Sequence, residues 1–84
     1  MERQVGRVTH YFGKVGVAAI ELEDELRVGD IIHVKGHTSD WTQKVNSMQI
    51  EHQQVQEAKP GDVIGIKVSE HAREHDVVYK VIED

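Results

Sequence analysis

Residues 58–68 read AKPGDVIGIKV, and this stretch decides the fold class. Pro60 and Gly61 stand at the second and third positions of a type II turn, because Pro fixes its own φ and Gly accepts the positive φ that the next position needs. The residues after Asp62 are rich in β-branched side chains, which favour extended backbone. The stretch therefore predicts a tight turn that leads into a strand over residues 63–68.

The same kind of turn recurs at two other places in the chain. Gly29-Asp30 precedes a strand expected over residues 31–35, and His75-Asp76 opens one expected over residues 76–82. In each turn we interpret the Asp side chain as a turn former that hydrogen-bonds nearby backbone. Gly29 supplies a positive φ, and His75 is a tolerated residue at the matching left-handed position.

The remaining apolar runs complete a set of six strands. They are expected over residues 4–11, 15–22, 31–35, 41–52, 63–68 and 76–82. Gly6 interrupts the first strand and indicates a bulge or the close approach of another backbone. In the fourth strand Val45 and Met48 differ in parity, so they share one face only if a bulge lies near Asn46 or Ser47.

Length and composition favour a single all-β domain over residues 1–84. Val and Ile supply 20 residues and Leu only two, which argues against a helical bundle, and the absence of Cys excludes disulfides. The intervals between turns are too short for βαβ units, so the strands are expected to be antiparallel. Closure would remove both sheet edges and bury one apolar face, and we therefore predict a six-stranded closed antiparallel barrel of Greek-key type. Its predicted interior is Val8, Val17, Ile20, Ile32, Val34, Val45, Met48, Ile64, Ile66, Val68 and Val78.

Net charge limits the choice of partner. A formal charge of −5 repels a phosphate backbone and disfavours strong, unspecific binding of nucleic acid. A local basic face remains compatible with that total, and we hypothesise that Arg3, Arg7, Lys14 and Lys67 form one that docks RNA; dispersed solubilising charge is the alternative. No apolar run approaches the roughly 18 residues that span a bilayer, and no signal-peptide core opens the chain, so a cytoplasmic protein without a membrane partner is expected.

Four segments of the chain carry a resemblance to a known family. They are residues 6–8, 26–34, 45–49 and 58–66, with the Gly-Asp turns at fixed places in the second and fourth. The series resembles the second, β-barrel domain of translational GTPases such as elongation factor Tu, and more closely small standalone translation elongation factor-like proteins. It also looks like the C-terminal domain of collagenase-like peptidase family proteins, some of which act in RNA hydroxylation.

Departures from the translation-factor pattern narrow the function. The nearest string to a phosphate-binding GxxxxGK[ST] loop is residues 13–16, which lack the leading Gly spacing and the Ser or Thr that would hold Mg²⁺, so nucleotide hydrolysis is excluded. Gln49 and Ile50 stand where elongation factor Tu has an aromatic residue and Arg near the aminoacyl end of transfer RNA. The resemblance therefore does not extend to that mode of binding.

The histidines suggest no reaction centre. His71 and His75 fit H-x-x-E-H, the inverted zinc-protease motif, but that motif needs a long helix, and this segment lies between two expected strands. His33 and His37 lie about 13 Å apart if they share a strand, too far for one metal ion. We predict no catalytic residue, no metal site and no cofactor.

Trp41 is an aromatic side chain with two open interpretations. It follows a polar loop and could stack a nucleobase, or it could cap one end of the barrel as part of the core. The same alternatives hold for Tyr11 and Phe12 at the first hairpin. Core packing is the favoured interpretation for all of them.

Together these observations predict a noncatalytic, monomeric translation elongation factor-like module that docks a ribosome, RNA or a protein. The candidate binding residues are Arg3, Arg7, Lys14, Lys67 and Trp41. The alternative is a standalone substrate-positioning domain that assists a peptidase-like or RNA-modifying enzyme, which predicts a protein partner.

Overall fold

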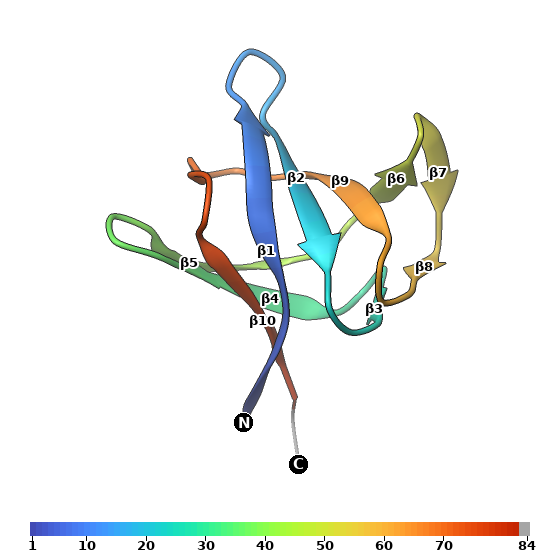
Figure 1. Ribbon diagram of the computed structural model, residues 1–84, viewed down its shortest axis with the longest axis horizontal. Coiled ribbons are helices and arrows are strands. Elements are labelled where there is room, and N and C mark those ends of the chain that lie inside the picture. Colours follow the sequence, from blue (N-terminus) through green and yellow to red (C-terminus); the bar gives the residue numbers. More distant parts are fainter. Residues whose placement is uncertain (83–84) are drawn as a thin grey trace.

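The computed structural model describes residues 1–82, and every regular element in that part of the chain is a strand (Figure 1). The strands are β1 (Glu2–Phe12), β2 (Val17–Leu22), β3 (Leu26–Arg27), β4 (Ile31–Lys35), β5 (Asp40–Lys44), β6 (Met48–Ile50), β7 (Gln53–Val55), β8 (Glu57–Ala58), β9 (Val63–Lys67) and β10 (Val77–Val81). The all-β class predicted from the β-branched composition is therefore confirmed.

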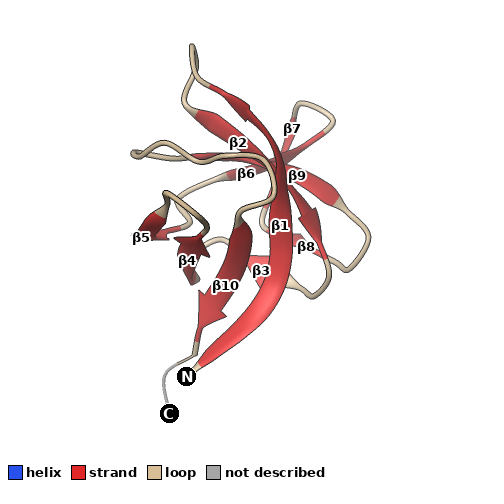
Figure 2. Cartoon of the chain, turned by 60° about the vertical axis from the view of Figure 1, so that its left-hand side comes forward, coloured by secondary structure: helices blue, strands red, loops and turns tan. Residues whose placement is uncertain are grey.

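The predicted closed barrel of six strands is wrong. Eight strands form one antiparallel sheet in the order β5-β4-β10-β1-β2-β9-β6-β7, and β3 and β8 form a separate pair. The buried apolar residues form one cluster, and the turned view shows how this long sheet curls (Figure 2). Its end strands β5 and β7 are not paired with each other, so the sheet is open.

The reason lies in the fourth predicted strand, over residues 41–52. The parity change expected near Asn46 or Ser47 is a break rather than a bulge, because residues 45–47 leave the strand altogether and divide it into β5 and β6. β6 is then paired on both sides, since Met48 lies opposite Ile66 of β9 and opposite Val55 of β7. No edge of β6 is left for β5, and closure fails there.

The hairpin of β6 and β7 carries no conventional turn signal. Glu51 and His52 have φ values of 50° and 67°, and positive φ at both central positions is the mark of a type I′ turn. Asn-Gly is the usual pair for such a turn, so the pair Glu51-His52 does not indicate a hairpin in the sequence. The short strands β3 and β8, of two residues each, are likewise unpredicted.

A single apolar core fills the curl of the sheet. Of the predicted interior residues only Val17 lies outside it, half-buried, because Ala18, Ile20 and Leu22 take the inward positions of β2. The prediction placed Val17 and Ile20 on one face although they differ in parity along a regular strand. All the other predicted interior residues are buried.

The three Asp turns share one hydrogen-bonding scheme. The Oδ2 atoms of Asp30, Asp62 and Asp76 each accept the N–H three residues earlier at 2.9 Å, and each Asp N–H donates back to that residue's carbonyl at 3.0–3.1 Å. The residue before each Asp has positive φ: 101° at Gly29, 93° at Gly61 and 75° at His75. The predicted role of these Asp side chains is confirmed.

His75→Gly is expected to raise the free energy of unfolding by about 1 kcal/mol. A non-Gly residue in the left-handed region is strained by roughly that amount, and Gly29 and Gly61 already relieve it in the two equivalent turns. Urea unfolding of the variant and the parent measures the gain. Gly61→Ala is the reciprocal control and should lose stability, and a His75→Gly protein less stable than the parent would contradict the strain argument.

Candidate functional site

The predicted basic residues do not gather into one patch. Arg3 lies near the start of β1 and pairs with Asp24 at 3.3 Å, whereas Lys14 lies in the turn after Phe12. At about 3.3 Å per residue, the length of β1 alone separates these ends by roughly 30 Å. The first hairpin does lie beside β9, since Val17 is opposite Lys67, so the structure brings only Lys14 and Lys67 toward a common end.

Arg7 lies among carboxylates. It is opposite Glu21 in the register of β1 and β2, and a shallow hollow at this point is lined by Arg7, Thr9, Glu21 and Glu23. Both acidic side chains are exposed beside it. The charge of Arg7 is therefore balanced locally, in keeping with dispersed solubilising charge.

Trp41 is a core residue. It is 8% exposed, and its Nε1–H donates to the carbonyl oxygen of His71 at 3.0 Å. This contact pins the loop between β9 and β10 to β5. Tyr11 also packs against that loop, with its ring centroid 4.4 Å from that of His71, while Phe12 remains exposed.

The H-x-x-E-H segment is an irregular loop and not a helix. The His71 ring packs against that of Tyr11 at an interplanar angle of 60°, and Oε1 of Glu74 lies 3.4 Å from Nδ1 of His10. In residues 1–82 no group of three His, Asp or Glu side chains is arranged to hold a metal ion.

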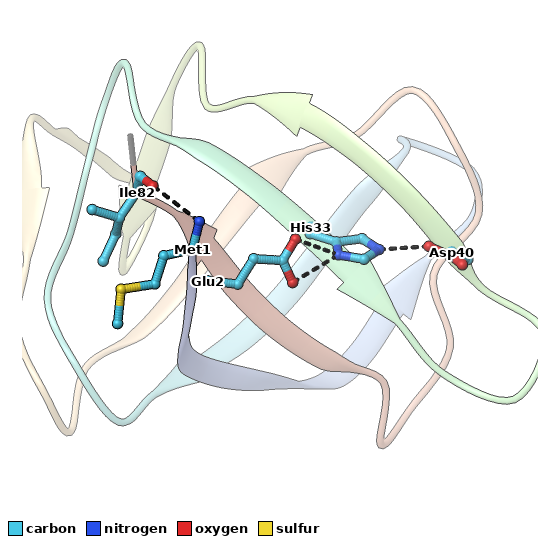
Figure 3. A network of polar contacts seen from close by, with 5 residues as sticks. All are labelled: Met1, Glu2, His33, Asp40 and Ile82. Atoms are coloured by element: carbon cyan, nitrogen blue, oxygen red, sulfur yellow. Dashed lines mark hydrogen bonds and ion pairs between the residues drawn. The ribbon is translucent and has the colours of Figure 1, made fainter. Parts of the chain in front are cut away.

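His33 lies between two carboxylates in a polar group that joins three strands. Its Nδ1 lies 2.9 Å from Oε2 of Glu2, and its Nε2 lies 2.5 Å from Oδ1 of Asp40. Figure 3 shows the imidazole between the two carboxylates, which come from β1 and β5. Both ring nitrogens donate when the imidazole is charged, so this ion triad, Glu2–His33–Asp40, joins the start of β1 to β4 and β5.

The triad changes the acidity of two of its members. The hydrogen bond to Asp40 raises the pKa of His33 above its ordinary value of 6.5, partial burial opposes this, and Glu2 adds to the rise. The same hydrogen bond lowers the pKa of Asp40 below its ordinary 3.8. The charged pair is thereby favoured over the neutral one.

Stability should depend on pH through this triad. A raised pKa in the folded state means that the contribution of His33 is complete below 6.5 and is lost as pH rises through the raised value. The lowered pKa of Asp40 means that its contribution is present above 3.8 and is lost as pH falls through the lowered value. Between these limits the parent should exceed His33→Gln in urea midpoint, and the gap should close as pH rises past the raised pKa of His33.

His37→Gln is the matched control for that comparison. His37 is an exposed histidine in the turn between β4 and β5, and its removal should leave the pH profile of the parent unchanged. A gap between the parent and His33→Gln that is equally large at about pH 5 and about pH 9 would show that the imidazole charge does not stabilise the fold.

A groove of about 520 Å³ lies where β5 and the end of β9 are not paired. Its walls come from β5, with Thr42, Gln43 and Lys44, and from the end of β9 and the chain after it, with Lys67 and Ser69. Lys44 and Lys67 are its charged lining residues, and no lining residue is acidic or aromatic. Sequence reasoning singled out Lys67 but missed the groove, because the groove exists only where closure fails.

The chain is similar in sequence to known proteases. No family model matches it. It is 42% identical over 81 residues to an uncharacterized protease of Methanocaldococcus jannaschii, an overlap that covers 95% of this chain and 20% of that protein. It is 40% identical over 78 residues to a collagenase of Porphyromonas gingivalis, covering 90% of this chain and 22% of the collagenase. The chain thus spans about a fifth of the length of these relatives.

Solved structures agree on the fold. The C-terminal domain of a putative U32 peptidase from Geobacillus thermoleovorans matches with a TM-score of 0.88 at 21% identity, over 94% of this chain and 92% of that domain. The selenomethionine variant of that domain matches with a TM-score of 0.86 at 20% identity, over 90% of this chain and 96% of that one. At such identities the likeness concerns the fold alone.

The predicted kinship with translation factors is wrong. The sequence relatives are a protease and collagenases, and the matching solved structures are the C-terminal domain of a putative peptidase. The predicted role as an elongation factor-like module in protein biosynthesis rested on that kinship and is wrong as well. That prediction rested on the spacing of turns and strands. Families with similarly spaced turns share this pattern, so it does not distinguish between them.

Proposed function

We propose that the chain is a noncatalytic substrate-positioning domain that works beside a peptidase-like enzyme body. One observation carries this proposal: the sequence match covers at least nine tenths of the chain but only about a fifth of the protease relatives. The fold also matches a solved domain described as the C-terminal part of a putative U32 peptidase. A module of this size contributes binding or orientation of the substrate. The bond-breaking chemistry belongs to the other four fifths of such a protease, which this chain does not match.

The polar contacts of the chain are consistent with a noncatalytic role. A covalent nucleophile needs a base within hydrogen-bonding distance. Among residues 1–82, the Thr9 hydroxyl donates to the carbonyl of Ala19, and the Ser69 hydroxyl contacts the amide of Gln43. No Ser or Thr hydroxyl in this part of the chain contacts a histidine or a carboxylate.

An exposed apolar area on the outer face supports contact with an enzyme body. Phe12, Val15 and Val63 are 48%, 62% and 52% exposed. Beside them a shallow hollow of about 280 Å³ has Ala19 and Gly65 among its lining residues, opposite each other on β2 and β9. Small residues flanked by exposed apolar side chains suit a protein surface that packs on the sheet.

Exchange into the collagenase of Porphyromonas gingivalis tests the proposal. Deleting the matched 78-residue segment should raise KM for a collagen substrate by about tenfold and leave kcat within about twofold, because remote binding groups are lost and reacting groups are kept. Inserting this chain in its place should restore most of the lost affinity.

The isolated chain serves as the control and should hydrolyse nothing. Hydrolysis by the isolated chain, or a deletion that abolishes kcat while KM is unchanged, would contradict a positioning role.

The described residues contain no helix of the length and apolar character that a membrane span requires. The cytoplasmic location and the monomeric state expected from the sequence stay predictions.

A further inference from the structure

The open edge of β5 presents unpaired backbone groups. Gly36 N donates to Ser39 O and Val45 N donates to Asp30 O, and these bonds fix the phase of the β4–β5 ladder. In an antiparallel ladder, bonded and non-bonded residue pairs alternate. The N–H and C=O groups of Thr42 and Lys44 therefore point away from β4, toward the groove between β5 and the end of β9.

On the opposite wall of the groove, the backbone groups of Lys67 and Ser69 form hydrogen bonds with the Gln43 side chain. Nε2 of Gln43 donates to the carbonyl of Lys67 at 2.7 Å, and its Oε1 accepts the N–H of Ser69 at 3.0 Å. These two bonds are the pair that one residue of a parallel neighbouring strand would make with the residues on either side of its partner. The carboxamide thus stands in for a strand at the position where the sheet fails to close.

Charge indicates what kind of strand would fit. The chain carries −5 in total, yet Lys44 and Lys67 are the charged residues of this groove and no carboxylate lines it. Both lysines are exposed and lie on opposite walls. Acidic side chains that alternate along an extended segment would reach one lysine or the other.

We propose that this groove binds an extended acidic polypeptide segment, which adds to the free edge of β5 as a further strand. The segment pairs with the backbone of Thr42 and Lys44, its carboxylates lie beside Lys44 and Lys67, and the Gln43 carboxamide moves aside or bonds to it. This inference rests on the proposed function, because it names the kind of segment that the positioning domain holds. Strand addition to an open edge is a general mode of peptide recognition.

The groove suits a peptide better than a nucleic acid. Its open backbone groups have the spacing of a strand, and hydrogen bonds to them require a partner with peptide geometry. Single-stranded nucleic acid is held largely by stacking on aromatic side chains, and none lines this groove. The core position of Trp41 removes the one indole from consideration.

Titration of the ¹⁵N-labelled chain with a blocked peptide of alternating Thr and Glu tests the proposal. We expect saturable amide shifts at Thr42, Lys44 and Ser69, and about tenfold weaker binding to Lys44→Glu/Lys67→Glu at low salt. Thr42→Pro should weaken binding by about fivefold, since it removes one N–H that faces the groove and leaves the ladder to β4 intact. Thr42→Val, which keeps that N–H, should bind like the parent.

Peptides methylated on alternate backbone nitrogens keep the test decisive if Thr42→Pro does not fold. Of the two alternating methylation patterns, one should abolish binding and the other should keep it, because only one edge of the added strand faces β5. Absence of peptide binding, equal binding of a Thr-Lys peptide, or binding of a uridine hexanucleotide in place of the peptide would overturn the proposal. If the collagenase exchange succeeds while the peptide fails, only the groove assignment is lost.

Discussion

Gly6→Ala should cost about 3 kcal/mol of unfolding free energy, which for a chain of this size lowers the melting temperature by about 15 °C. A Cβ at Gly6 would lie 2.5 Å from the carbonyl oxygen of Glu21 and 3.0 Å from Cγ2 of Ile20. The nearer atom belongs to the backbone of β2, so relief requires β1 and β2 to separate in the middle of the sheet. Small domains are stabilised by only about 5–15 kcal/mol, so this loss removes a large share.

Gly13→Ala is the matched control for that substitution. Gly13 is exposed in the first hairpin turn, and a Cβ there would meet only the Tyr11 ring, at 3.6 Å. Its unfolding free energy should stay within about 0.5 kcal/mol of the parent. Urea unfolding of both variants measures the difference, and a Gly6→Ala protein as stable as Gly13→Ala would show that β1 and β2 are less tightly apposed than the structure indicates.

Gly6 also illustrates what the sequence alone makes predictable. A lone Gly within an apolar run indicated a bulge or a close approach, and the structure has both, since the β1–β10 register shifts between Gln4 and Gly6. The three Asp turns were predictable for the same reason, because a positive φ followed by Asp is a local requirement that a few residues satisfy. Features fixed by neighbouring residues can be inferred without knowledge of the rest of the chain.

Features fixed by distant residues could not be inferred. Whether the sheet closes depends on the break at residues 45–47 and on β7 occupying the second edge of β6, and β7 follows a turn at Glu51 and His52 without Gly or Asn. The groove beside Gln43 is a consequence of that open edge. The triad of Glu2, His33 and Asp40 joins residues from three strands that no spacing rule relates.

Removal of the Asp side chain should cost more in the third turn than in the other two. Asp76 is 3% exposed, whereas Asp30 and Asp62 are half-buried, although all three accept an N–H three residues earlier at 2.9 Å. We expect Asp76→Ala to lose about 2–3 kcal/mol and the other two Ala variants about 1 kcal/mol each. In the buried turn the freed Arg73 N–H is less able to recover a bond to water.

The surroundings of Asp76 add to that cost. The residue opposite, Gly36, leaves no room for a side chain because the Asp76 carboxylate fills the space where a Cβ would lie, so Asp76→Ala opens a void there. Asp76 O also accepts the N–H of Val8, at 2.8 Å, which ties the turn to β1.

Thermal and urea unfolding of the three Ala variants measure the predicted order. Asp76→Asn is the conservative control: it keeps an oxygen acceptor and the side-chain volume, and should regain more than half of the loss. Each Ala variant loses the same hydrogen bond, so that loss is common to the three turns. The remaining difference in unfolding free energy between the variants therefore measures the effect of burial. Equal losses in all three turns would mean that the scheme itself, and not its surroundings, sets the energy.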